Sequence, residues 1–171
     1  MTSDARGGDP LWERADAAKV RQVDLPPSAR ELSTLPRIDY SDAFLFDAVS
    51  TRDVSAEDLM REVLEGAPVA VRAQLLSGWS AIGLKVHIGS ERSVLGWEIR
   101  RAAPDHVLLG ADSRIGMPGE LLLKKEDGAL LFATFVAQRN LLARTVWTVT
   151  EPAHVRVVRA MLGQASRRLR A

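Results

Sequence analysis

The sequence predicts an α+β domain in which a curved antiparallel β-sheet wraps around one long C-terminal helix. Between residues 94 and 126, apolar and polar side chains alternate with a period of two, which is typical of antiparallel strands joined by short turns. Residues 141–169 follow the helical period instead, because apolar side chains seven or eleven positions apart fall on one face. Two shorter helical patterns lie between the first strand and the rest, so the chain order is strand, two helices, strands, long helix.

The composition narrows the class of protein. With 171 residues, 46% of them apolar and 26% charged, the chain fits one globular domain of ordinary size. A formal net charge of +1 gives no reason to expect nucleic acid as a partner. Cysteine is absent, and no apolar run approaches the ~20 residues of a membrane span. Residues 1–10 are polar and lack the apolar core of a secretion signal, so we expect a cytoplasmic protein.

Residues 1–40 differ from the rest and are interpreted as an N-terminal extension, flexible or loosely docked. They contain several glycines and prolines and few bulky apolar side chains. A thin apolar stripe over residues 11–23 favours a short helix there, and Trp12 is a residue type that often anchors such a tail. The domain itself is therefore placed at residues 41–171.

The elements of the domain have separate signals. A compact apolar run at residues 43–49 predicts the first strand. Ser55 and Asp58 have the spacing of a helix capping box, and Pro68 suits the first position of a second helix. Asp127 and Gly128 predict a tight hairpin turn. The strands after the helix pair are expected at residues 94–101, 106–115, 120–126 and 129–139, with a further short one near 85–88.

The strand at residues 129–139 is apolar on both faces, although an antiparallel sheet can leave one face in water. One face should meet the C-terminal helix. The other should be covered by the N-terminal extension, by a partner chain or by the rest of a closed sheet. A homodimer is therefore one of three alternatives.

The order of elements and a few short motifs resemble the START-like (SRPBCC) superfamily and its helix-grip fold. The matching residues are Gly96-Trp97-Glu98, the stretch MPGEL at 117–121, Thr134-Phe135, Val146-Trp147 and Pro152-Ala153-His154. Over about residues 40–168 the chain is similar to the bacterial polyketide-cyclase/dehydrase-like group, and particularly to an uncharacterised branch of it. The resemblance implies a sheet that grips the last helix, usually with six strands between the helix pair and that helix.

His154 is the strongest single candidate for chemistry. It lies in the middle of an apolar stripe of the C-terminal helix that also holds Trp147, Val158, Met161 and Ala165. The arginines at 156, 159 and 167 are expected on the opposite side. The imidazole could donate a hydrogen bond to the carbonyl of a bound ligand or act as an acid/base near neutral pH. Alternatively, it could form a hydrogen bond with a backbone carbonyl of the sheet and hold the helix in place. The sequence offers no convincing second titratable group within reach of it.

Three tryptophans, Trp79, Trp97 and Trp147, come from separate elements and are expected to converge on one interior. Pockets lined by aromatic side chains and a few polar groups hold small apolar ligands, whereas plain core packing is the alternative. The expected ligand-binding residues are Trp97, Leu109, Met117, Phe135, Trp147, His154, Val158 and Met161.

Other polar residues carry weaker signals. Asp112 and Arg114 share a strand face, where they orient a polar ligand group or form a cross-strand ion pair. His87 and His106 have no second ligand at metal-binding spacing, so no metal site is expected. Phosphate-binding and nucleophile-elbow motifs are missing, so we expect no cofactor. Tyr40, the only tyrosine, reaches a cavity mouth or anchors the extension.

Three functions fit these patterns. The first is the binding of an apolar or amphipathic small molecule between the sheet and the C-terminal helix, without catalysis. The second, implied by the resemblance, is a cyclase- or dehydrase-like enzyme with His154 as acid/base and Arg114 assisting. The third is a cavity-free scaffold that dimerises. If a pocket exists, His154→Ala should change the free energy of unfolding by less than about 1 kcal/mol, whereas a larger loss would argue that His154 is structural.

Overall fold

A computed structural model describes residues 20–49 and 51–171 and confirms the α+β class. The strands are β1 (Val20–Val23), β2 (Tyr40–Phe46), β3 (Ser93–Val94), β4 (Trp97–Ala102), β5 (His106–Ala111), β6 (Gly119–Glu126) and β7 (Ala129–Val136). The helices are α2 (Pro27–Arg30), α3 (Ala56–Leu64), α4 (Val69–Ala81) and α5 (Leu141–Arg168). All strand pairs are antiparallel, in the order β1-β2-β7-β6-β5-β4-β3.

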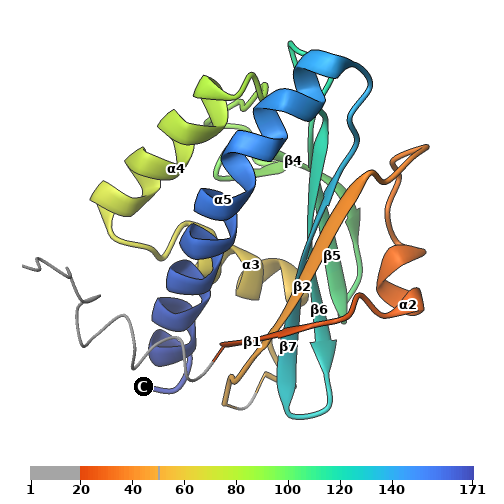
Figure 1. The fold of residues 1–171 in the computed structure, drawn as a ribbon. Helices are drawn as coiled ribbons and strands as arrows, with labels where there is room; N and C mark the ends of the chain where they lie inside the picture. Colours follow the sequence, from red (N-terminus) through yellow and green to blue (C-terminus); the bar gives the residue numbers. More distant parts are fainter. Residues whose placement is uncertain (1–19, 50) are drawn as a thin grey trace, which may run out of the picture.

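The layers follow a helix-grip arrangement, as the sequence predicts. Figure 1 shows α5 along one face of the curved sheet, α4 on the far side of α5, and α2 on the opposite face of the sheet. Helix α3 begins at the predicted cap, where the Ser55 side chain accepts a hydrogen bond from the Asp58 N–H at 3.1 Å. Helix α5 begins in the same way, since the Asn140 side chain accepts from the Ala143 N–H at 2.8 Å. None of the helices in the described part of the chain is long and apolar enough to cross a membrane.

The strands between the helix pair and α5 differ from the prediction over residues 85–101, where the strand predicted at 94–101 is divided in two, and the strand predicted at 106–115 ends at Ala111. Residues 85–88 form no strand, and this stretch is flanked only by an isolated bridge between Leu84 and Ser113. The extra strand is β3 instead. It arises because Leu95 and Gly96 take positive φ values of 44° and 85°, which turn the chain tightly between Val94 and its partner Trp97.

Part of the predicted extension belongs to the sheet. Val20–Val23 pairs with β2 as an edge strand, so the helix predicted at 11–23 is wrong for these residues. The rest of that helix and Trp12 lie outside the described residues. Short strands carry little periodic signal, and here pairing with β2 decides the conformation. The division at residue 40 stays a prediction.

The second apolar face of β7 is covered by the chain's own N-terminal residues. Phe135 belongs to a buried cluster on this face together with Ala29 of α2. The partly buried side chains that pack against the cluster include Val23, Leu25, Leu32, Leu35 and Ile38. Of the three coverings considered for this face, the structure therefore shows the N-terminal segment.

Glu120 fastens this covering segment to the sheet. Its side chain is fully buried on β6 and accepts hydrogen bonds from the hydroxyls of Ser33 and Thr34. It also accepts from the Thr34 N–H at 3.0 Å and from the Arg100 guanidinium at 3.4 Å. Gly110 leaves room for this arrangement, because a Cβ there would collide with the Arg100 side chain.

The main core lies on the other face, between the sheet and the helices. The apolar face predicted for α5 is buried at Trp147, Val158, Met161 and Ala165. Arg159 departs from the prediction that it faces away from the core. Its guanidinium donates to the Gln22 side chain at 3.0 Å and lies 5.4 Å from the centre of the Phe44 ring, because β1 and β2 extend the sheet beneath this side of α5.

Candidate functional site

A hollow of about 330 Å³ lies between α4, α5 and the sheet, and we call it the outer hollow. It is within the size range of small-molecule pockets, roughly 300–1,000 Å³. Its lining is largely apolar and comes from Leu64, Gln74, Leu75, Gly78, Trp79, Ala81, Ile82, Leu121, Phe132, Trp147, Thr150, Ala153, His154, Val157, Val158 and Met161. The sheet, α4 and α5 thus each contribute one wall.

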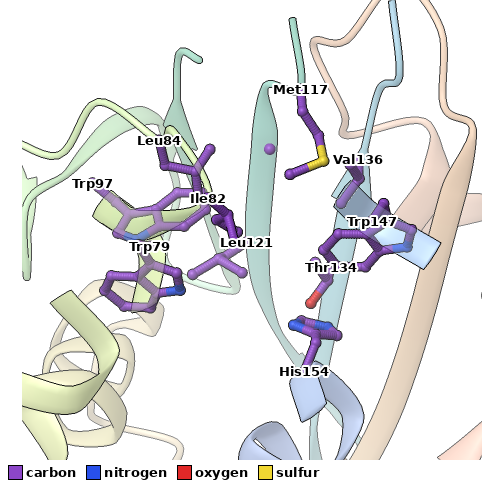
Figure 2. Close-up of a pocket in the computed structure, with 11 residues that line it drawn as sticks. Trp79, Ile82, Leu84, Trp97, Met117, Leu121, Thr134, Val136, Trp147 and His154 are labelled. Atoms are coloured by element: carbon purple, nitrogen blue, oxygen red, sulfur yellow. The ribbon is translucent and has the colours of Figure 1, made fainter. Parts of the chain in front are cut away.

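A smaller space of about 40 Å³ adjoins it, and we call this the inner hollow. Figure 2 shows its lining, which consists of Trp79, Ile82, Leu84, Trp97, Met117, Gly119, Leu121, Thr134, Val136, Trp147 and His154. The residues shared by both hollows are Trp79, Ile82, Leu121, Trp147 and His154. The two hollows therefore lie side by side against these five side chains.

The predicted convergence of the three tryptophans is confirmed. The rings of Trp79 and Trp97 meet edge to face with their centres 5.3 Å apart, and Trp147 lines the same inner hollow. Most of the predicted ligand-binding residues also lie at the two hollows. Trp97 and Met117 line the inner one, Val158 and Met161 line the outer one, and Trp147 and His154 line both.

Two of the predicted residues do not line these hollows. Leu109 is buried in the main core beside Trp97 but reaches neither space. Phe135 lies on the opposite face of the sheet, under the N-terminal segment. Alternate residues of a strand point to opposite faces, and on β7 it is Phe132 and Thr134 that face the hollows. Both faces of β7 are apolar, so the pattern could not show which one meets the helices.

His154 has a titratable partner that sequence reasoning missed. Its Nε2 lies 2.9 Å from Oδ2 of Asp42 on β2. The Asp42 side chain is fully buried, and that of His154 is 15% exposed. The Tyr40 hydroxyl donates to the same Oδ2 at 2.8 Å, and its ring packs 4.8 Å from the Trp147 ring. His154 is therefore held by a carboxylate, which corrects both the expected sheet carbonyl and the expected lack of a second titratable group.

The hydrogen bonds to Asp42 define which nitrogen of His154 carries the proton. Burial, and then the charge of Asp42, raise the pKa of Tyr40, so the phenol stays protonated and donates. A carboxylate can only accept, so Nε2 of His154 must also be a donor. Nδ1 then accepts a hydrogen bond if the ring is neutral and donates one if the ring is protonated. No hydrogen bond to Nδ1 is formed by any residue in 20–49 or 51–171.

Further polar atoms at this site are buried without a hydrogen-bond partner in the described structure. Asp42 Oδ1 and Thr134 Oγ1 are two of them, and their residues lie directly opposite each other in the β2–β7 register. The indole nitrogens of Trp97 and Trp147 are the others. Neither lining includes a lysine or an arginine. The site thus combines apolar walls with a few unsatisfied neutral polar groups and one buried carboxylate.

The remaining polar candidates lie elsewhere. Asp112 forms the cross-strand ion pair considered for it, with Arg100 at 3.2 Å, whereas Arg114 lines neither hollow and cannot assist His154 there. His106 pairs with the neighbouring Asp105. Among residues 20–49 and 51–171, no group of three or more histidine, aspartate and glutamate side chains is placed to hold a metal ion.

Comparisons with known proteins leave the class of molecule open. No protein-family profile and no curated protein matches this chain. Among solved structures, CalU16 from Micromonospora echinospora is similar over 74% of each chain, with 13% identity and a TM-score of 0.37. PA94, a Pseudomonas aeruginosa protein of unknown function, is similar over 82% of this chain and 79% of its own, with 15% identity and a TM-score of 0.26. At these scores neither likeness bears on ligand or chemistry.

Proposed function

We propose that this protein binds an apolar or amphipathic small molecule in the outer hollow, between the sheet and α5. The observation that carries the proposal is the hollow itself, about 330 Å³ in volume and lined almost entirely by apolar side chains. Burial of ~200 Å² of ligand apolar surface there would contribute about 5 kcal/mol before the cost of association. Without that cost, about 5 kcal/mol corresponds to a dissociation constant of about 0.2 mM, and it requires no chemistry. The order of elements also supports a place in the START-like superfamily.

The alternative of a dimerising scaffold has less support. The dimer is an alternative because the second face of β7 is apolar, but residues of the same chain cover that face. The enzyme alternative gains one observation, because the Asp42 carboxylate orients His154 as a base would require. It also loses one, because Arg114 lines neither hollow. Non-covalent binding is common to both remaining functions, so it is tested first.

Blocking the outer hollow should weaken binding. Ala153 lies between Thr150 and Val157 on the face of α5 that lines this space and is exposed, so Ala153→Trp places an indole at its opening. We expect the dissociation constant of the neutral probe N-phenyl-1-naphthylamine, followed by its fluorescence, to rise by about tenfold or more, as the loss of one ring's contacts predicts.

The matched control is Val149→Trp, which adds the same ring to the same helix at a position that is 78% exposed and outside the lining. This variant should bind the probe within about twofold of the unchanged protein, since substitutions away from a site have small effects. Equal binding by the Ala153→Trp protein would show that the outer hollow is not the site.

A further inference from the structure

The polar atoms where the two hollows meet carry information about the ligand's head group. Thr134 is 4% exposed, and its hydroxyl has no hydrogen-bond partner in the described structure. Figure 2 shows this hydroxyl pointing toward the His154 ring, whereas the Trp147 indole nitrogen lies on the far side of its own ring. A buried hydroxyl without a partner is unfavourable, so this position suits a ligand atom that can exchange a hydrogen bond with it.

His154 supplies a second hydrogen-bonding atom beside this hydroxyl. Its Nε2 is held by Asp42, and its Nδ1, on a ring that lines both hollows, accepts a hydrogen bond when the ring is neutral and donates one when the ring is protonated. A ligand group that can both donate and accept pairs with this nitrogen in either state. Ethers, esters and simple ketones cannot do so.

Charge excludes a second class of head group. The buried Asp42 carboxylate lies directly behind His154, and neither lining supplies a lysine or arginine to offset another anion. A ligand carboxylate or phosphate would therefore bring a second negative charge into a largely apolar space without a cation to pair with it.

Taking these observations together, and resting on the proposed function, we propose that the ligand carries a neutral hydroxyl group, as an alcohol or a phenol, at the junction of the two hollows. The hydroxyl forms hydrogen bonds with Nδ1 of His154 and with the Thr134 hydroxyl, because it can donate and accept. The inner hollow, at about 40 Å³, has room for only a small group, so the apolar body of the ligand extends into the outer hollow.

Three naphthalenes that differ in one substituent test this. They are 2-naphthol, which donates, 2-methoxynaphthalene, which only accepts, and 2-naphthoate, which is an anion at neutral pH. We expect calorimetric titration at neutral pH to show 2-naphthol binding at least about tenfold more tightly than either analogue, because each analogue leaves buried polar groups unpaired or adds a charge. Apolar burial alone would favour the ether, since it is the least polar of the three.

Substitutions at Thr134 show whether the preference comes from this junction. Thr134→Val keeps the shape of the side chain and removes the hydroxyl, so the preference for 2-naphthol over the ether should fall about tenfold. Thr134→Ser keeps the hydroxyl and should retain the preference. Thr148→Val is the control, since its hydroxyl bonds the Arg144 carbonyl on the exposed side of α5 and lines neither hollow.

Nuclear magnetic resonance of the protein labelled with ¹⁵N-histidine tests the contact with Nδ1 directly. In two-bond ¹H–¹⁵N correlations, 2-naphthol should shift the Nδ1 signal of His154 more than 2-methoxynaphthalene does. His106 is an internal reference, because it lines neither hollow and its signals should not shift. The His154 signals are assigned by their loss in the His154→Ala protein.

The outcomes separate this inference from the proposed function. Binding of all three naphthalenes without preference, tightest binding of 2-naphthoate, or an Nδ1 signal of His154 that 2-naphthol leaves unchanged would overturn the hydroxyl head group and leave the hollow as a binding site. Failure of all three to bind, together with failure of N-phenyl-1-naphthylamine, would overturn the proposed function and the inference with it.

Discussion

Replacement of His154 by alanine is expected to destabilise the protein by about 2 to 3 kcal/mol, because it leaves a buried carboxylate short of a partner. Asp42 is fully buried, its Oδ1 already has no partner in the described structure, and Oδ2 would keep only the Tyr40 hydroxyl. This is a larger loss than the limit of about 1 kcal/mol that the sequence predicts if a pocket exists, and it gives His154 a structural role beside the pocket. The additional loss of stability comes entirely from the unpaired Asp42 carboxylate.

Chemical denaturation at neutral pH measures this loss, with His106→Ala as the control. His106 also pairs with an aspartate, but Asp105 is 64% exposed, and water replaces the lost partner. We therefore expect the control to change the free energy of unfolding by less than about 0.5 kcal/mol, as for other surface pairs. If the two variants lose the same small amount, His154 does not stabilise the Asp42 carboxylate.

Replacement of Glu120 by glutamine is expected to have the largest effect on stability, about 3 kcal/mol. The amide has nearly the same shape, but its NH₂ group cannot accept the hydrogen bonds that the carboxylate takes from Ser33, Thr34 and Arg100. Each lost or reversed hydrogen bond to a buried charge costs about 1.5 to 3 kcal/mol, partly recovered as the segment shifts. The Arg100 guanidinium also loses its buried counter-ion.

Hydrogen exchange shows where this effect is located. Amides of residues 24–38 should exchange much faster in the Glu120→Gln protein, because the carboxylate fastens this segment to the outer face of the sheet. Glu126→Gln is the control, since Glu126 is 35% exposed and only pairs with Lys124 on the same strand. If residues 24–38 lose no more protection from exchange than the sheet does, Glu120 does not specifically hold this segment in place.

The elements with strong local signals were predictable from the sequence. The capping residue Ser55, the turn at Asp127 and Gly128, and the long apolar stripe of α5 each act over a few positions. Their boundaries in the structure lie within a few residues of the predicted ones. The edge strand β1 and the short helix α2 were not predictable, because a proline-rich segment with scattered leucines is ordered here by the sheet that it covers.

Only some residues of the candidate site could be predicted from the sequence, for two physical reasons. A strand that is apolar on both faces does not reveal its orientation, so Phe135 was chosen where Thr134 lines the site. The partner of His154 is 112 positions away in the chain, and no local pattern connects a histidine in a helix with an aspartate in the first long strand. A signal did exist, since Asp42 is a charged residue directly before Ala43 and Phe44, which are fully buried on the same strand.

The most direct test of the central claim is native mass spectrometry of the protein as purified from cells, followed by organic extraction. Occupation of the outer hollow predicts a mass excess that disappears on denaturation, and an extract containing a small apolar or amphipathic molecule with a hydroxyl group. The claim would be contradicted by a protein that carries no added mass and gains none after incubation with N-phenyl-1-naphthylamine.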